Sequence, residues 1–170
     1  FRSHFHCRSN DESVISQKKW FPYNKGGSSR RWYGNYILVV NYFNNGYEIY
    51  ELKEKEGRNC QNYPDKYKFT PCITWSTAAA DAFRYQVPGV LFDTKGMCMF
   101  TNDTPYCLAY LNSNTSKHFL NILSPGTDTQ VGHLRIMPFI YNSDKKADID
   151  YLTKNNITIS QLDWDAHETS

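Results

Sequence analysis

Residues 32–43 read WYGNYILVVNYF, and they are followed by Asn44, Asn45 and Gly46 and then by residues 47–52, YEIYEL. A run rich in aromatic and β-branched residues is typical of a β-strand. Asn and Gly accept positive φ, so Asn44 to Gly46 predict a hairpin turn. The alternating charge and bulk of residues 47–52 predict the return strand. This stretch therefore predicts an antiparallel hairpin.

Outward from this hairpin, short apolar segments of similar length recur along the chain and are separated by turn residues. Together they predict about eight or nine strands, a spacing typical of a β-sandwich or a closed barrel. A barrel of about eight strands removes the sheet edges and leaves room for one small ligand. The further predicted strands are residues 66–76, 82–87, 90–92, 97–101, 106–111, 118–123 and 133–141.

One segment near the end of the chain has helical spacing instead. Ala147 and Tyr151 recur at i, i+4, and Asp144 can cap the helix start. We therefore expect an all-β fold, an eight-stranded antiparallel up-and-down barrel with one C-terminal α-helix. The expected layout is a single domain, 1–170, with an N-terminal arm at 1–17, a barrel at 19–141, a helix at 144–156 and a tail at 157–170.

Length and charge restrict the class of protein. The 170 residues fit one ordinary domain, and 19 basic against 17 acidic residues give a net charge of +2. Such a balance argues against a nucleic-acid partner or an anionic membrane surface. No apolar run approaches the ~18 residues of a membrane-spanning helix. We therefore expect no nucleic-acid partner and no membrane span.

The cysteines and glycosylation sequons favour an oxidising compartment. Because the chain begins with Phe1, we expect that a signal peptide has been removed. Asn114 and Asn156 are the candidate glycosylation sites, and the expected location is extracellular. Five cysteines leave one without a partner, and the pairing stays open. The disulfide candidates are Cys7, Cys60, Cys72, Cys98 and Cys107.

The order of these elements resembles that of the lipocalin superfamily. Residues 18–21 (KKWF) lie where that family has a G-x-W motif, and residues 100–110 resemble its T-D-Y corner and the following strand. Residues 148–157 resemble its external helix. Lys18 replaces the motif glycine and no cysteine follows Cys107, which points to a divergent branch such as arthropod secreted lipocalins. A different all-β sandwich, from a secreted or viral surface protein, is the alternative.

Aromatic residues supply the candidate ligand site. Aromatic walls with a few polar tips suit small ligands and can hold an amine by cation–π contact. The alternative is that each of these side chains fills the core. The candidate ligand-binding residues are Trp32, Tyr36, Tyr50, Trp75, Phe83, Tyr85, Phe100, Tyr110 and Phe139.

Motifs for catalysis are weak. The sequence contains no G-x-S-x-G, no H-E-x-x-H and no phosphate-binding glycine loop, and Gly26-Gly27 indicates a turn. A nucleophilic cysteine would need a lowered pKa, whereas a disulfide is the more common state in an oxidising compartment. His4, His6 and Cys7 could bind a metal, with a disulfide at Cys7 as the alternative. We expect no enzyme activity, no cofactor and no metal.

The function expected from these features is a secreted binding protein that sequesters or carries a small hydrophobic or amphipathic ligand, such as a lipid, a pigment or a biogenic amine. The alternative is a secreted β-domain that binds another protein through its loops, without a small ligand. An enzyme built on a cysteine in the barrel mouth is a third hypothesis.

Overall fold

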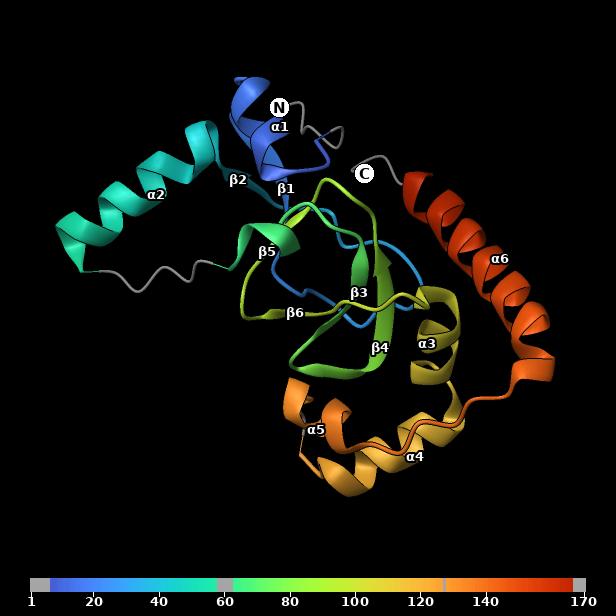
Figure 1. The fold of residues 1–170 in the computed structure, drawn as a ribbon. Helices are drawn as coiled ribbons and strands as arrows, with labels where there is room; N and C mark the ends of the chain where they lie inside the picture. Colours follow the sequence, from blue (N-terminus) through green and yellow to red (C-terminus); the bar gives the residue numbers. More distant parts are fainter. Residues whose placement is uncertain (1–6, 58–62, 127, 167–170) are drawn as a thin grey trace. The chain divides into compact units, whose positions relative to one another are not determined.

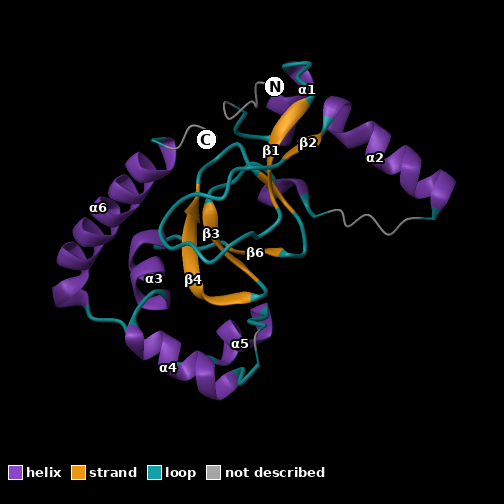
Figure 2. Ribbon diagram, turned by 180° about the vertical axis from the view of Figure 1, so that it is seen from behind, coloured by secondary structure: helices purple, strands orange, loops and turns teal. Residues whose placement is uncertain are grey.

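The computed structural model describes residues 7–57, 63–126 and 128–166 of the chain. Helices and strands are mixed along these residues, and the strands form two three-stranded sheets (Figures 1 and 2). Neither sheet closes into a barrel. The prediction of an all-β, eight-stranded up-and-down barrel over residues 19–141 is therefore wrong.

The chain divides into two compact units, each assembled from separated segments. Unit 1 contains Phe1–Lys25, Tyr36–Pro71 and Val87–Thr94. Unit 2 contains Gly26–Asn35, Cys72–Gln86 and Lys95–Ser170. Each unit has its own cluster of buried apolar side chains.

The sheet of unit 1 has β1 (Trp20–Asn24) at its centre. β2 (Val39–Asn41) pairs with β1 antiparallel, and β5 (Leu91–Phe92) pairs with it parallel over two residue pairs. Phe21 on β1 is fully buried, and its ring centroid lies 5.4 Å from that of Phe69. Edge-on packing of this kind suits the ring quadrupoles. The helices of this unit are α1 (Asn10–Ile15), α2 (Phe43–Glu56) and the 3₁₀ turn η1 (Asp65–Tyr67).

The predicted hairpin does not form: within residues 32–43 only β2 is a strand, and residues 47–52 belong to α2. Asn44, Asn45 and Gly46 do adopt left-handed conformations, with φ of 47°, 59° and 76°. The chain leaves this turn into the helical part of α2 instead of a strand. Glu48 and Glu51 are three residues apart, which is helical spacing, and Lys55 pairs with Glu51 at 2.5 Å. A segment of six residues is too short to distinguish the strand period of 2 residues from the helix period of 3.6 residues.

The sheet of unit 2 has β3 (Cys72–Ser76) at its centre. β4 (Ala79–Gln86) and β6 (Gly96–Met99) flank it, both antiparallel. All five residues of β3 are buried, and Trp75 donates a hydrogen bond of 2.8 Å to the Thr129 carbonyl. The apolar residues Ile73 and Trp75 alternate along β3, and both faces of the strand are nevertheless buried.

Helices complete unit 2, where the sequence predicted strands. They are α3 (Thr104–Leu111), α4 (Asn114–Leu123), α5 (Val131–Ile136), η2 (Ser143–Lys145) and α6 (Lys146–Asp165). The strands predicted at 106–111, 118–123 and 133–141 are therefore wrong. Pro105 in the first turn of α3 and the Ser113 cap of α4 are helix-start signals that the aromatic pattern obscured. The predicted C-terminal helix, 144–156, overlaps η2 and α6.

Asn112 joins α3 to the sheet. Its side-chain oxygen accepts from the Phe83 N–H at 3.1 Å, and its amide donates to the Phe83 carbonyl at 3.0 Å. Phe83 is fully buried on β4, so its backbone groups need partners within the protein. One side chain therefore satisfies both.

Substitution Asn112→Ala should destabilise the chain by about 1–3 kcal/mol, because the buried Phe83 N–H loses its partner. Urea unfolding followed by circular dichroism measures the change. Asn155→Ala, on the exposed side of α6, is the control and should stay within about 0.5 kcal/mol. Equal effects of the two substitutions would contradict this role for Asn112.

Candidate functional site

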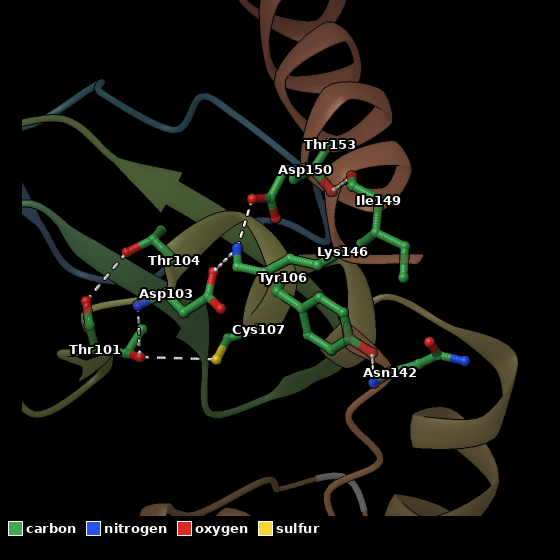
Figure 3. Close-up of polar contacts among 10 residues, drawn as sticks. All are labelled: Thr101, Asp103, Thr104, Tyr106, Cys107, Asn142, Lys146, Ile149, Asp150 and Thr153. Carbon is green, nitrogen blue, oxygen red and sulfur yellow. Dashed lines mark hydrogen bonds and ion pairs between the residues drawn. The ribbon is translucent and has the colours of Figure 1, made fainter. Parts of the chain in front are cut away.

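The start of α3 is built from closely spaced polar residues (Figure 3). Asp103 precedes the helix, and its N–H donates to the Thr101 hydroxyl at 3.2 Å. The Thr104 hydroxyl donates back to the Thr101 carbonyl at 3.4 Å. These local bonds fix the turn into α3 and hold the Asp103 carboxylate beside the first turn of α6.

Lys146 connects the two helices. Its ammonium group lies 2.8 Å from Asp103 and 2.5 Å from Asp150, between the two carboxylates (Figure 3). Hydrogen bonds to Asp103 and then to Asp150 raise the pKa of Lys146 above its ordinary value. A raised lysine pKa stabilises the fold below the unfolded pKa, and this stabilisation is lost as pH rises through the folded value. The ion pairs therefore persist across the neutral range.

The segment 137–142 lies against α3 through tyrosine hydroxyls. The Tyr106 hydroxyl accepts from the Asn142 N–H at 2.8 Å (Figure 3). The same hydroxyl donates to the Ile140 carbonyl at 3.3 Å. The Tyr110 hydroxyl donates to the Pro138 carbonyl. Burial raises the pKa of Tyr110, which keeps this donor protonated. Two hydroxyls on one helix thus hold a segment that has no secondary structure of its own.

This arrangement creates an aromatic surface, defined by Tyr106, Tyr110, Phe139 and Tyr141. The Tyr106 ring lies 4.9 Å from Tyr141 and 6.0 Å from Phe139, and the Tyr110 ring lies 5.0 Å from Phe139. The two tyrosines of α3 are buried, whereas Phe139 and Tyr141 are 52% and 53% exposed. The buried tyrosine rings support the two exposed rings, which form a platform on which a ligand could stack.

A cleft of 310 Å³ lies beside the aromatic surface. This volume is at the low end of small-ligand sites, which span roughly 300–1,000 Å³. A second cavity of 230 Å³ also borders Tyr110 and is lined mainly by apolar side chains, among them Met99, Leu134 and Phe139. The residues that line the larger cleft are Tyr106, Ala109, Tyr110, Ser113, Thr115, Ile140 and Ile149.

The cysteines at and near α3 are poorly suited to act as nucleophiles. Burial raises the pKa of Cys107, which lowers its thiolate fraction at neutral pH, and burial also raises that of Cys72. The hypothesis of a nucleophilic cysteine therefore gains no support from these two thiols. Across residues 7–57, 63–126 and 128–166, no group of three or more His, Cys, Asp or Glu could hold a metal ion. Within the same ranges, no helix is long and apolar enough to cross a membrane.

The candidate ligand residues fall in both units. Tyr36 and Tyr50 belong to unit 1, and the other seven to unit 2. Trp75 and Phe83 are fully buried in the core of unit 2, with Trp32 and Tyr85 packed against it. Tyr110 and Phe139 belong to the aromatic surface, while Phe100 follows β6 and is partly buried. As ligand contacts, all nine remain predictions.

The cysteines and sequons have these positions. The four described cysteines, Cys7, Cys72, Cys98 and Cys107, are free thiols, and Cys60 lies outside the described residues. His4 and His6 lie outside them as well. Asn114 is exposed at the start of α4, and Asn156 is partly buried on α6. Glycosylation of these asparagines and an extracellular location remain predictions.

Comparison with known proteins identifies relatives of a different class from the predicted one. No protein-family model matches the chain. The chain is 40% identical over 169 residues to the adenine-specific methyltransferase PglX of Lacticaseibacillus casei (strain Zhang), covering 95% of the chain and 14% of that protein. It is 33% identical over 159 residues to the adenine-specific methyltransferase BrxX of Escherichia coli O9:H4 (strain HS), covering 89% of the chain and 12% of that protein. The chain thus spans a small part of the length of both relatives.

These relatives overturn the functional predictions. The predicted resemblance to lipocalins is wrong, because both relatives are named as adenine-specific methyltransferases. The predicted secreted carrier of a small ligand is wrong for the same reason, and so is the alternative of a secreted β-domain that binds another protein through its loops. The predictions of no enzyme activity, of a small hydrophobic or amphipathic partner and of no nucleic-acid partner are contradicted for the same reason.

The sequence did not lead us to predict Tyr106, Tyr141 or Lys146 as site residues. The helix-start signal at Pro105 would have placed Tyr106 and Tyr110 on one helix face.

The ion pairs of Lys146 should be measurable in a double-mutant cycle. Lys146→Met should lower the urea midpoint, and Asp103→Asn should lower it little further when combined with Lys146→Met, because both substitutions remove the same contact. Lys145→Met, one residue earlier and exposed, is the matched control and should have little effect. Strict additivity of the two changes would show that the Lys146–Asp103 pair does not couple α3 to α6.

Proposed function

We propose that this chain is a segment of an adenine-specific methyltransferase and that it contacts the nucleic acid that carries the target adenine. The observation that carries the proposal is the 40% identity to PglX over 95% of the chain. Because the match covers 14% of that protein, the segment supplies one part of a larger enzyme.

The methyl-transfer step is assigned to other parts of such an enzyme. Nucleotide-like cofactors bind at the carboxyl ends of strands in open parallel sheets. Within the described part of the chain, parallel pairing is limited to two residue pairs between β1 and β5 and one bridge between Trp32 and Arg84. These residues do not fit a site for the methyl donor, and no step of the transfer is derived from them.

The aromatic surface suits contact with a nucleobase. Enzymes that modify a base turn it out of the stack and hold it against aromatic or apolar side chains. Stacking of a base on an aromatic ring contributes about 1–3 kcal/mol. Phe139 and Tyr141 are half exposed and held from below by Tyr106 and Tyr110, so the platform needs little ordering before it binds.

The near-neutral net charge does not oppose this proposal. Net charge reports the field of the whole chain, whereas stacking depends on local ring exposure. Acidic side chains beside the aromatic surface are partly neutralised: Lys146 pairs with Asp103 and Asp150. A base can therefore approach the exposed rings of the aromatic surface without meeting two uncompensated carboxylates.

Binding of the chain to a fluorescein-labelled DNA duplex with one unpaired adenine tests the proposal. The double substitution Phe139→Ala, Tyr141→Ala should raise Kd about 5- to 150-fold, because the exposed rings of the stack are lost. The dependence of Kd on salt should stay unchanged, since no charge is removed. Fluorescence anisotropy measures both quantities.

Tyr151→Ala is the matched control, because Tyr151 is an aromatic residue 66% exposed on α6. Its Kd should equal that of the unsubstituted chain. Equal losses at Tyr151 and at the Phe139–Tyr141 pair would refute base contact at the aromatic surface. A lower Kd for RNA of the same sequence than for DNA would show that the natural ligand is RNA.

The link to methylation is tested in the longer relative. PglX of Lacticaseibacillus casei, with its matching segment replaced by this chain, should still methylate adenine. The same chimera with Phe139→Ala and Tyr141→Ala should show a raised KM for DNA and an unchanged KM for the methyl donor, because the aromatic surface contacts only the nucleic acid. A raised KM for the methyl donor would place the surface in the cofactor site instead.

A further inference from the structure

The glycine-serine-arginine loop of unit 2, residues 26–31 (GGSSRR), is held by a buried arginine. Arg84 on β4 is 1% exposed. Its guanidinium donates to the carbonyls of Gly26 at 3.1 Å, Ser28 at 3.4 Å and Arg30 at 3.4 Å. One buried side chain thus binds the carbonyls of three loop residues.

Two more side chains hold the same edge of the loop. The Asn35 amide donates to the carbonyls of Gly26 at 3.2 Å and Ser28 at 2.9 Å. The Ser76 hydroxyl donates to the Gly27 carbonyl at 2.8 Å. The carbonyls of three consecutive residues, 26 to 28, are therefore all turned inward onto donors of the protein.

The inward carbonyls determine where the N–H groups point. In a trans peptide the C=O of one residue and the N–H of the next point in opposite directions. The N–H groups of Gly27 and Ser28 therefore face away from Arg84, Asn35 and Ser76. Residues 27–29 are exposed to solvent. Successive outward N–H groups in a turn form a concavity that binds anions.

Glycine is required at two positions of this loop. Gly26 and Gly27 have φ of 84° and 97°, in the left-handed region that L side chains rarely adopt. A Cβ at Gly26 would lie 2.8 Å from the Lys95 carbonyl oxygen. The backbone can therefore take this course, with its carbonyls inward, only because neither residue carries a side chain.

Positive side chains adjoin the outward N–H groups. Arg31 is exposed next to the loop, and the Arg84 charge lies directly behind it. Arg30 is fixed separately, since it pairs with Asp163 and its guanidinium lies 5.1 Å from the Trp164 ring. Oriented N–H groups with arginine charge beside and behind them are the elements that bind phosphate oxygens.

We infer that the loop at residues 26–31 is a phosphate-binding site and that its ligand is a backbone phosphodiester of nucleic acid. The choice of phosphodiester over free phosphate rests on the proposed function. The loop would fix the position of the strand, because phosphate contacts set register and orientation without reading bases. The turn predicted from Gly26-Gly27 is thus also part of the inferred phosphate-binding site.

Selective ¹⁵N labelling of glycine in the unsubstituted chain tests this inference directly. Nine glycines give a sparse amide spectrum, and labelling with 1-¹³C,¹⁵N-glycine assigns the Gly27 signal, because Gly27 is the one glycine in the sequence that follows another glycine. Addition of a DNA duplex should shift the Gly27 signal, and inorganic phosphate should shift it at much higher concentration. Gly57 and Gly132, which have open surroundings, are the internal controls.

A charge-neutralising variant gives the second readout. Arg31→Gln should weaken DNA binding for all base sequences and lower the slope of log Kd against log salt by about 1. Lys154→Gln, an exposed lysine on α6, is the control and should leave the slope unchanged. DNA binding with an unmoved Gly27 signal and an unchanged slope would overturn the loop site and leave the proposed function standing.

Two other outcomes separate the sources of the anion. A Gly27 shift with inorganic phosphate and none with DNA would overturn the assignment to a phosphodiester. Absence of DNA binding even at low salt would overturn the proposed function and this inference with it.

Discussion

The buried guanidinium of Arg84 is the constraint on which unit 2 depends. A charge removed from water is costly unless hydrogen bonds replace its hydration. Here the carbonyls of Gly26, Ser28 and Arg30 accept hydrogen bonds from the two terminal nitrogens, so the loop and the charge stabilise each other. The residues on either side of Arg84 reinforce the attachment: the Trp32 N–H donates to the Phe83 carbonyl at 2.9 Å, and the Tyr85 N–H donates to the Trp32 carbonyl at 2.8 Å. Segment 26–35, which lies between two segments of unit 1 in sequence, is thereby held as part of the unit 2 sheet.

A second set of contacts in unit 2 fixes the position of the aromatic surface. Asn112 attaches the end of α3 to Phe83, and Lys146 attaches the start of α3 to α6. With both ends of α3 fixed, Tyr106 and Tyr110 hold the segment 137–142 by hydrogen bonds to its backbone. The exposed rings of Phe139 and Tyr141 then rest on the tyrosines below. A segment with no helix or strand of its own thus gains a defined position from one helix, in the way that binding segments are often positioned by a rigid scaffold.

Local backbone features were predictable from residue type, and the fold was not. Asn44, Asn45 and Gly46 adopt the positive φ that their side chains allow, yet the next segment is a helix. YEIYEL is too short to separate a period of 2 from a period of 3.6. The aromatic segments at 106–111 and 118–123 were assigned to strands because Tyr and Phe are common there, but Pro105 and Ser113 begin helices, and the burial of Tyr106 and Tyr110 in unit 2 decides the outcome. The importance of Arg84 had no local signal, since its partners lie more than fifty residues away in sequence.

The central claim is that a nucleobase contacts the aromatic surface, and photo-crosslinking measures this contact directly. The chain would be irradiated with a DNA duplex that carries 8-azidoadenine as its unpaired base, digested with trypsin and analysed by mass spectrometry. Cleavage after Arg135 and Lys145 releases residues 136–145, which contain both Phe139 and Tyr141. The account predicts that the crosslinked nucleotide is found on this peptide. Crosslinks confined to peptides of unit 1, or to the 147–154 peptide of α6, would contradict it.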